Sequence, residues 1–589
     1  MTTAVESGAE GVRWDLTPLA PSEEGMKERL EGAVADAAAF VERWPADAIE
    51  TIEPERLAAL LGELAELRAA HDEGEYWAML LTWTDSGNPA VQDVQAWVDN
   101  RLPRFDEAIR HFELAWTASP DDRASELADS EDVARDRHYL RSVRRFKPFQ
   151  LSPAEERALS TREASAASAW KSLRDRTLGA LVAPFDDGTG ERDWPLSDLE
   201  SARRVHPDRD VRRRAQEATN ALIEPVLPVL AHCYDALVAD RLAVDQLRGF
   251  SDPMAPRVLQ DELDSAVVEG LLAAAEEHVE IGHRWFRAKA DLLGLDRLDA
   301  IDTAAPIDAD ASMEWEAGRK LVVDMFAGLT PEMGAEAERF FSEHRIDAET
   351  RPGKPAGAFC AWPSTRTTGF VLVNWHGRIG DVLTTAHELG HGVHAALSVQ
   401  AQSDNSFKTG LAIVEIPSTF AELRFVDSLL EEDHPLARPL LARTLDQSVL
   451  VAFTASALAR YEQRAYALRA EGKALNADRL CELSEGALAP VRGDAITDEL
   501  RHDPLIWASL PHFVHERFYT YAYTFALLLS AGLLARSRDP GFPARYERFL
   551  RAGGSASPED LMAILEVDLR DPEIWNDGFA VLDSWIDRI

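Results

Sequence analysis

Apolar residues recur along most of this chain at the three- and four-residue spacing of amphipathic helices. Three such stripes lie within the first 110 residues, and turn residues at 86–89 separate the second from the third. They comprise Met26, Leu30, Val34, Ala37, Val41 and Trp44; then Leu57, Leu60, Leu61, Leu64 and Leu67; then Val91, Val94, Trp97, Val98, Leu102, Phe105 and Ile109. Similar patterns fill residues 200–293 and the chain beyond 433, so the sequence predicts a mostly α fold whose stripes are packing surfaces.

Two stretches depart from the helical pattern and predict β-structure. Residues 181–194 contain a turn signal at Asp187-Gly188 between short apolar segments, which predicts a hairpin and a lobe boundary. Residues 358–362 and 369–375 predict two strands joined by a turn. The second strand leads directly into a helix, so an extended peptide could pair with its edge, unless the hairpin is purely structural. The expected substrate strand comprises Gly369, Phe370, Val371, Leu372, Val373 and Asn374.

The helix expected after this strand carries the pattern His-Glu-x-x-His. We predict that it begins with Asp381 as its N-cap, and apolar residues at 382, 386, 389, 393 and 397 form its buried stripe. His387 and His391 are four residues apart, so both imidazoles project from one face and can share a Zn²⁺ ion. Glu388 lies beside the position of a reacting water. Gly390, which destabilises a helix by about 1 kcal/mol relative to Ala, suits a close approach of another backbone.

Two histidines do not complete a zinc shell, and Glu415 is the better candidate for the third ligand. His394 lies one helical repeat from His387, roughly 10 Å along the axis, whereas Zn–N bonds are about 2.1 Å. Glu415 stands just before Pro417, which suits the first turn of a new helix. Glu422 lies two turns further on the same side, where it can orient a ligand histidine.

Composition narrows the class of partner. The net charge of −40 over 589 residues and the isoelectric point of about 4.8 disfavour nucleic acid and anionic membranes. A basic run at Arg203, Arg204 and 212–214 is expected to be a solvated helix face.

The cysteines and the apolar segments indicate a cytoplasmic protein. The three cysteines are widely spaced and match no metal or disulfide pattern, which is typical of a reduced compartment. The first ten residues have neither a basic nor an apolar region, so no signal peptide is expected. The longest apolar run, 522–535, is too short for a membrane span and predicts a buried core helix.

The motifs together resemble the oligoendopeptidase F branch of the thimet oligopeptidase family of zinc peptidases. The resemblance covers nearly the whole chain, and residues 115–180 resemble that branch's N-terminal accessory segment. It rests most strongly on Phe359-Cys360, on Asn374, on His387-Glu-Leu-Gly-His391-x-x-His394 and on Glu415-x-Pro-Ser-x-x-x-Glu422.

The resemblance also implies a role for the aromatic segment 512–523. In the family, a histidine and tyrosines of this segment line the cleft opposite the zinc, which points to His512 and to one or two of Tyr519, Tyr521 and Tyr523 as hydrogen-bond donors to the substrate, with Tyr519 and Tyr523 preferred. The sequence departs from the family pattern at Arg517 and at 524–525.

The sequence therefore predicts a large two-lobed helical body that encloses a cleft, with a small sheet beside the zinc helix. Its expected segments are an N-terminal helical region (1–114), an accessory helical segment (115–184) and a catalytic domain (185–589, core 351–530). We expect a cytoplasmic zinc endopeptidase for short unstructured peptides, with one Zn²⁺ on His387, His391 and Glu415, Glu388 as the base, and Glu422 and His394 around the ligands. The alternatives are a zinc carboxypeptidase or dipeptidase of related fold, or an inactive helical peptide-binding protein; no sequence signal indicates an oligomeric state.

Overall fold

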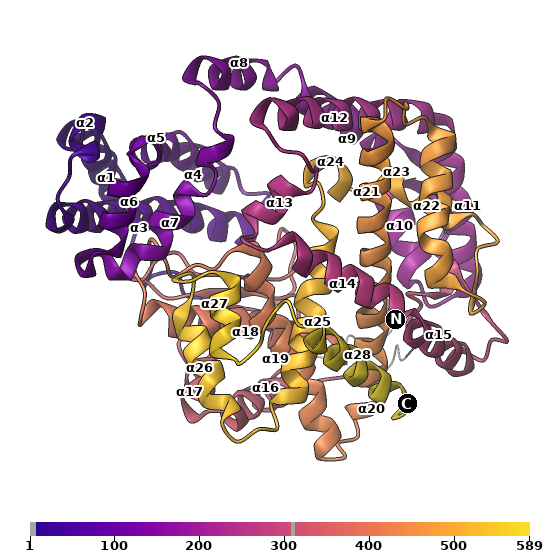
Figure 1. Ribbon diagram of the computed structural model, residues 1–589. Coiled ribbons are helices and arrows are strands. Elements are labelled where there is room, and N and C mark those ends of the chain that lie inside the picture. Colours follow the sequence, from indigo (N-terminus) through magenta and orange to yellow (C-terminus); the bar gives the residue numbers. More distant parts are fainter. Residues whose placement is uncertain (1–7, 308–311) are drawn as a thin grey trace. The chain divides into compact units, whose positions relative to one another are not determined.

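The computed structural model of the chain describes residues 8–307 and 312–589, and it is mostly helical, as predicted (Figure 1). Helices account for 69% of the residues and strands for 4%. The first seven residues, which fall in the stretch examined for a signal peptide, lie outside the described part. The chain divides into two compact units, each assembled from three separate stretches. This division by compactness is of a different kind from the three consecutive segments expected from the sequence (1–114, 115–184 and 185–589), which stay a prediction.

Unit 1 comprises residues 1–148, 311–432 and 536–568. Its described elements are α1 (Glu23–Arg43), α2 (Ala46–Glu50), α3 (Pro54–Thr84), α4 (Pro89–Asp99), α5 (Leu102–Ala118), α6 (Asp121–Asp129), η1 (Glu131–Asp136), α7 (Arg137–Arg144), α16 (Trp315–Leu329), α17 (Pro331–Ser342), β4 (Ile346–Asp347), β5 (Phe359–Ala361), β6 (Phe370–Leu372), α18 (Ile379–Val399), α19 (Leu411–Glu431), α26 (Phe542–Ala552) and α27 (Pro558–Ile564). A short helix, η2 (Lys147–Phe149), lies at the boundary.

The N-terminal stripes and the small sheet share one hydrophobic core in unit 1. Leu57, Leu61 and Leu64 of α3 belong to the same buried cluster as Phe370 and Leu372 of β6. The sheet has the order β4-β6-β5, with β4 parallel and β5 antiparallel to β6. Its packing against the N-terminal helices fixes the strand that leads into α18.

Unit 2 comprises residues 149–310, 433–535 and 569–589. Its described elements are α8 (Pro153–Glu163), α9 (Ala167–Gly179), β1 (Val182–Phe185), β2 (Arg192–Pro195), α10 (Leu196–Val205), α11 (Arg209–Ile223), η3 (Glu224–Val226), α12 (Leu227–Arg248), α13 (Ala255–Gln260), α14 (Ser265–Glu277), α15 (Val279–Leu293), β3 (Leu298–Asp299), η4 (Ala300–Asp302), α20 (Ala437–Val449), the π-helix η5 (Leu450–Ala455), α21 (Ser456–Ala470), α22 (Ala477–Arg492), β7 (Ile496–Thr497), α23 (His502–Ser509), α24 (His512–His515), α25 (Thr520–Arg536) and α28 (Glu573–Ile586).

The β-hairpin and the apolar helix predicted for unit 2 are both present. Strands β1 and β2 pair antiparallel around the turn at Asp187-Gly188. The apolar run at 522–535 lies in α25, in which nearly every residue from Thr520 to Leu534 is buried. Continuous burial on all sides is the property of a core helix, and it explains why this run shows no amphipathic period.

Among the described residues, one stretch of unit 2 has the length and the apolar composition that a membrane-spanning helix needs. It comprises residues 209–248, that is α11, η3 and α12. Cys233, Leu237 and Val238 of α12 are nevertheless buried in the unit. On the same helix the Arg241 guanidinium donates hydrogen bonds to the backbone carbonyls of Phe513 and Val514. These contacts are those of a packed core helix.

Candidate metal centre

Two helices of unit 1, α18 and α19, supply the predicted metal ligands (Figure 1). All five residues of the stripe predicted on α18, at 382, 386, 389, 393 and 397, are buried. A Cβ atom added to Gly390 would lie 2.6 Å from the Pro417 carbonyl oxygen and 2.6 Å from Ser418 Cα of α19. The glycine therefore permits the close backbone approach expected from the sequence, and this approach brings Glu415 to the two histidines.

Both helices begin earlier than predicted. Asp381 is not the N-cap but the third residue of α18, and its Oδ2 accepts the backbone N–H groups of Arg378 and His376 at 3.0 and 2.6 Å. Helix α19 begins at residue 411, so Pro417 lies inside it. The prediction that Pro417 marks the first turn was wrong because proline, although it removes one internal hydrogen bond, can be tolerated where neighbouring contacts hold the helix. Here the Ser418 hydroxyl donates to the Glu415 carbonyl at 2.9 Å.

The donor atoms of His387, His391 and Glu415 converge on one point. Glu415 Oε2 lies 3.5 Å from His387 Nε2 and 3.4 Å from His391 Nε2, and one donor atom from each residue lies within 4.8 Å of the others. Bonds of about 2.1 Å to a tetrahedral zinc ion place ligand atoms about 3.4 Å apart. The donor set of two imidazoles and one carboxylate therefore fits Zn²⁺ in chemistry and in spacing.

The electrostatics of the three donors favour a positive charge between them. Burial alone would lower the pKa of His387, but contacts with Glu415 and Glu422 raise it to about 10. Burial alone would raise the pKa of Glu415, yet the two imidazoles hold it well below its usual range. The same field that stabilises an imidazolium also stabilises a divalent cation at this position.

The two residues expected around the ligands occupy different surroundings. Glu422 Oε2 lies 3.5 Å from His387 Nδ1, on the side of the ring opposite Glu415, which suits an orienting role. His394 does not belong to the ligand cluster; it is 5% exposed and stacks against Phe549 at 6.2 Å between ring centres. Burial lowers the pKa of His394 to about 3, so this imidazole is neutral.

Glu388 lies beside the donors in a cavity of about 490 Å³ that belongs entirely to unit 1. Its side chain is buried, which raises the pKa of the carboxyl, and it accepts the backbone N–H of Cys360 on β5. That hydrogen bond fixes the carboxylate while the cavity in front of it stays open to a ligand. The position therefore suits an acid–base group.

The strand beside the cavity is β5 rather than β6, which corrects one prediction. The expected substrate strand, residues 369–374, contains β6, and β6 is the central strand with β4 on one side and β5 on the other. Its backbone groups are already paired on both sides, and Phe370, Val371 and Leu372 are fully buried. Because β5 is an edge strand and residues 358–360 line the cavity, it is the strand of this sheet with which an extended peptide in the cavity could pair.

The predicted histidine and tyrosines form an aromatic group in unit 2. His512 Nε2 lies 3.1 Å from the Tyr523 hydroxyl, and the Tyr519 ring stacks on the His512 ring with an interplanar angle of 8°. Tyr519 and Tyr523 lie one helical turn apart and meet edge to face at 5.1 Å. The three side chains thus form one polar aromatic surface.

Tyr521 points the other way, into the core. Its hydroxyl donates to Asp261 Oδ2 at 2.6 Å, and the side chain is fully buried. Asp261 in turn holds Arg257 through two hydrogen bonds of 2.8 and 2.9 Å, and the Arg257 guanidinium lies over the Tyr519 ring at 4.7 Å. Of the three tyrosines, Tyr519 and Tyr523 are therefore the ones that can meet a ligand.

Several residues around these groups had no sequence signal. Arg257 and Asp261 support the tyrosines from a segment more than 250 residues away in the sequence. In unit 1, Tyr76 of α3 and Lys408 line the metal cavity, and the Lys408 ammonium lies 4.8 Å from the Tyr76 ring centre. Only the tertiary structure brings these pairs together, and no motif marks them.

Comparison with known proteins agrees with these features. The sequence profile of peptidase family M3 matches residues 330–581, and the profile named oligopeptidase F matches residues 116–182. The chain belongs to peptidase family M3. Within that family it is of the oligoendopeptidase F type.

Curated relatives are similar at low identity. Oligoendopeptidase F of Lactococcus lactis subsp. cremoris is 24% identical over 387 residues, which are 65% of this chain and 64% of that protein. The group B oligopeptidase PepB of Streptococcus agalactiae is 23% identical and covers 84% of this chain and 83% of its own length. The chain thus spans somewhat less than two thirds of the Lactococcus relative.

Solved structures share the fold. A protein from Chlamydophila abortus superimposes with a TM-score of 0.85 at 20% identity, covering 98% of this chain and 97% of its own. Oligoendopeptidase-F from Enterococcus faecium gives a TM-score of 0.67 at 16% identity, with coverage of 96% and 98%. At these identities the likeness describes the fold.

Proposed function

We propose that this protein is a zinc endopeptidase that hydrolyses short, unstructured oligopeptides. The observation that carries the proposal is the convergence of His387, His391 and Glu415 on one point beside Glu388. Membership of peptidase family M3 supports hydrolysis of peptide bonds. Oligopeptides as substrates agree with the names of the relatives, which are oligopeptidases and oligoendopeptidases.

His387, His391 and Glu415 would hold one zinc ion per chain, with Glu422 orienting His387 and His394 closing the cavity behind them. Bound there, zinc would lower the pKa of water toward 7 and polarise the scissile carbonyl. Glu388 takes the proton of the attacking water and delivers it to the leaving amine. The hydrogen bond from the Cys360 N–H keeps its carboxylate in place for both transfers.

The aromatic group of unit 2 supplies the remaining polar contacts in this proposal. His512 and Tyr523, supported by Tyr519, donate hydrogen bonds to the carbonyl oxygen as negative charge develops on it. The substrate backbone pairs with the outer edge of β5 beside the Cys360 N–H that holds Glu388, and this strand replaces the one predicted from the sequence. Backbone pairing demands no particular side chain, so it suits peptides of varied sequence.

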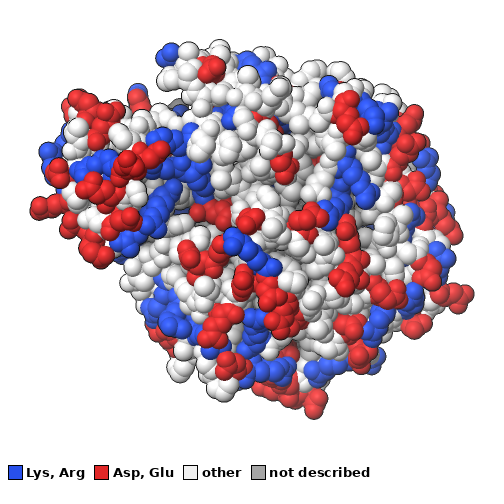
Figure 2. All heavy atoms as spheres, viewed as in Figure 1, with Lys and Arg blue, Asp and Glu red and all other residues white. Residues whose placement is uncertain are grey.

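The surface agrees with peptides, rather than nucleic acid or membranes, as partners. On the face drawn in Figure 2, basic side chains lie in small groups among acidic ones. The net charge of −40 also opposes binding to polyanions. We place the protein in the cytoplasm, as the reduced cysteines suggest.

Substitution of Glu388 by Gln tests the proposal. The amide keeps the shape of the side chain but cannot accept the proton, so kcat should fall by roughly 10²–10⁴ while bound zinc stays near one per chain. Metal content is measured by mass spectrometry. Turnover is measured with a peptide blocked at both termini, because a carboxypeptidase would not cleave such a peptide. Wild-type protein that contains no zinc and leaves every peptide intact would favour the inactive binding protein.

A further inference from the structure

Unit 2 contains a second and larger cavity, of about 850 Å³, lined entirely by its own residues. The wall is formed by α10, η4, the π-helix η5, the helices α22 and α23, and the start of α25. His512 and Tyr523 of the aromatic group also line it. The side chain of Tyr523 is 38% exposed, so the cavity reaches the surface beside the groups that we assign to the substrate carbonyl.

The basic residues at the end of α10 lie in this cavity wall. The sequence predicts a solvated helix face for this run, and that prediction was wrong for Arg203, which lines the cavity, and for Arg212, which is buried. The Arg203 Nε atom is buried and has no hydrogen-bond partner among the described residues. Its Nη1 lies 3.4 Å from His502 Nδ1, and burial lowers the pKa of the guanidinium to about 10. The group beside this buried guanidinium is thus a neutral imidazole, and none of the ion pairs of the described residues includes Arg203.

The remaining charges of the wall leave a positive excess. Arg492 is paired with Asp503, with 2.9 Å between Arg492 Nε and Asp503 Oδ2. Arg204, which is exposed, forms no ion pair within the described chain, and Glu200 is the one carboxylate set against Arg203 and Arg204. Neither guanidinium is within salt-bridge distance of Glu200. The wall can therefore accept one further carboxylate.

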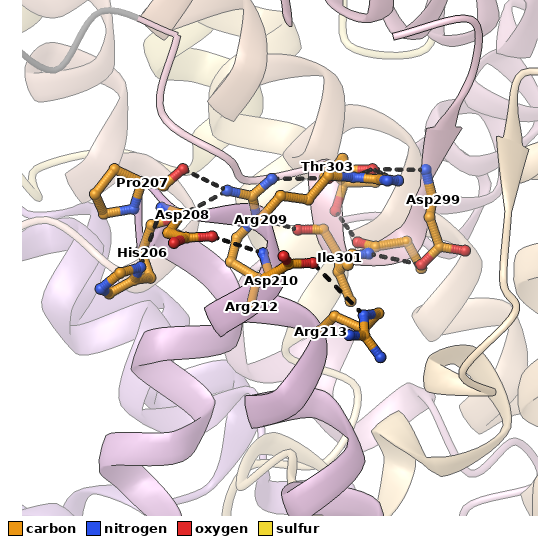
Figure 3. A network of polar contacts seen from close by, with 12 residues as sticks. His206, Pro207, Asp208, Arg209, Asp210, Arg212, Arg213, Asp299, Ile301 and Thr303 are labelled. Atoms are coloured by element: carbon orange, nitrogen blue, oxygen red, sulfur yellow. Dashed lines mark hydrogen bonds and ion pairs between the residues drawn. The ribbon is translucent and has the colours of Figure 1, made fainter. Parts of the chain in front are cut away.

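A network of polar contacts holds this wall in place (Figure 3). Arg212 donates to the carbonyl of His206, just after α10, and to the carbonyl of Ile301 in η4, at 2.9 and 3.1 Å. Arg209 and Arg212 both bind the fully buried Asp302, at 2.7 and 2.8 Å. The end of α10 is thereby tied to η4, so Arg203 and Arg204 are presented by a rigid support, which is what a specific anion site requires.

The interior of the cavity is apolar where it faces away from the arginines. Phe286, Leu450, Leu458 and Ile506 line it there. An occupant that matches the cavity has a carboxylate at one end and apolar groups beyond it. A free amino terminus does not match, because its ammonium group would meet the two guanidinium groups.

We propose that this cavity receives the C-terminal residues of the peptide substrate, with Arg203 and Arg204 binding a carboxylate of the peptide. The inference rests on the proposed peptidase function, since it assigns a substrate region to the same enzyme. The carboxylate can come from the chain terminus or from an acidic side chain close to it. Either source gives charge-assisted hydrogen bonds to the arginines.

Three peptides of one sequence test this inference with the zinc-loaded enzyme. The first has a free C-terminal acid, the second a C-terminal amide, and the third is an amide with Glu in place of a Gln next to the terminus. The wild type should cleave the free acid with a kcat/KM about tenfold higher than the amide. If the third peptide is cleaved as fast as the free acid, an acidic side chain near the terminus is a sufficient source of the carboxylate.

Variants then assign the preference to the cavity. Arg203→Met removes the cation at similar volume and should bring the acid-to-amide ratio close to one, whereas Arg203→Lys should keep part of it. Arg213→Met is the matched control, because Arg213 is half exposed, pairs with Glu217 and lies outside the cavity. Its ratio should equal that of the wild type. If Arg203→Met does not fold, the wild-type comparison alone decides.

The outcomes separate this inference from the proposed function. Equal cleavage of all three peptides by the wild type would overturn the inference and leave the peptidase function in place. If no peptide is cleaved, the peptidase function fails, and binding of the labelled acid and amide to the Glu388→Gln protein is compared by fluorescence anisotropy. Tighter binding of the acid would still support the carboxylate site, and equal binding would refute it.

Discussion

The two cavities of this protein differ in how their polar groups are arranged. In unit 1 the ligands His387, His391 and Glu415 contact one another within 29 residues of sequence, and Glu422 contacts His387 from behind. In unit 2 the cavity wall draws on α10, η4, α22, α23 and α25, and Arg203 Nε and Thr520 Oγ1 have no partner among the described residues. The first arrangement serves a small ion with short-range, directional bonds, and the second leaves donors for a larger flexible ligand.

The difference shows why a short motif can specify one kind of site and not the other. A metal site needs three donor atoms within a few ångströms, which one helix and a neighbouring turn can provide. A peptide cavity needs volume and separated contacts, which only the tertiary fold can provide. Substitutions of the three metal ligands in unit 1 should therefore lower zinc content and rate together, and substitutions of the cavity-lining groups in unit 2 should change rate or affinity with zinc content unchanged.

Removal of the third ligand is expected to have the largest effect on the metal. Glu415→Ala should weaken zinc binding by more than the roughly 10–100-fold that is typical for loss of an orienting partner, because a direct ligand is lost. Activity should fall with metal occupancy. Chelator competition followed by metal analysis measures the affinity.

His394→Ala provides the contrast for the same measurement. Because the His394 ring lies outside the ligand cluster, the variant should retain most of its zinc, although loss of packing against Phe549 reduces its stability. A metal-free His394→Ala protein together with a zinc-loaded Glu415→Ala protein would reverse the ligand assignment.

The tyrosines of unit 2 should separate by the direction of their side chains. Tyr523→Phe removes the hydroxyl next to His512 and should lower kcat and kcat/KM equally, by about 10²-fold, with zinc content unchanged. Tyr521→Phe should leave the kinetics nearly unchanged but reduce the free energy of unfolding by about 1–3 kcal/mol, because it leaves the buried Asp261 short of one donor. Steady-state kinetics and chemical denaturation are measured on both variants. A large kinetic loss in Tyr521→Phe alone would contradict this assignment and give the catalytic hydrogen bond to the tyrosine that faces the core.

The sequence predicted the helical class, the hairpin at 182–195 and the buried stripe of α18 because each depends on local periodicity or turn chemistry. The two histidine ligands were predicted for the same reason, since the four-residue spacing of His387 and His391 determines their common face. Glu415 does meet them, although the helix start at Pro417 from which it was predicted lies elsewhere. The limits of α18 and α19 were predicted less well, because Asp381 and Pro417 are compatible with more than one position in a helix.

The substrate strand shows what local patterns cannot predict. Residues 370–372 have the composition of a strand, but the partner on their far side, β4, lies some 25 residues earlier and is only two residues long. Without β4, β6 would have a free edge; because β4 covers that edge, β5 is the outer strand that borders the cavity. The place of Arg203 in a cavity wall could not be predicted either. A basic run in the sequence predicts a solvated helix face whether or not a cavity lies beside it.

The smallest expected effect concerns a buried carboxyl next to the aromatic group of unit 2. Its ionisation should change the stability of the protein. Glu462 is fully buried, and its Oε2 accepts the backbone N–H of Phe518 at 2.7 Å. Phe518 has a positive φ of 54°, so this hydrogen bond supports a strained residue directly before Tyr519. Burial raises the pKa of Glu462 to about 8, against the opposing effect of Arg241.

The sign of the pH dependence follows from that raised pKa. The folded protein binds the Glu462 proton more tightly than the unfolded chain does, so its stabilising contribution is complete below about pH 4.5 and is lost as the pH rises toward about 8. Glu462→Gln keeps an acceptor for the Phe518 N–H but cannot ionise. Between pH 5 and pH 9 the wild type should therefore lose about 1–3 kcal/mol more free energy of unfolding than this variant. Urea denaturation at several pH values measures the difference, with the exposed Glu277→Gln as control because its carboxyl has no buried environment to lose. Parallel pH profiles for the wild type and Glu462→Gln would mean that Glu462 is ionised in the folded protein, with Arg241 or Arg517 compensating its charge.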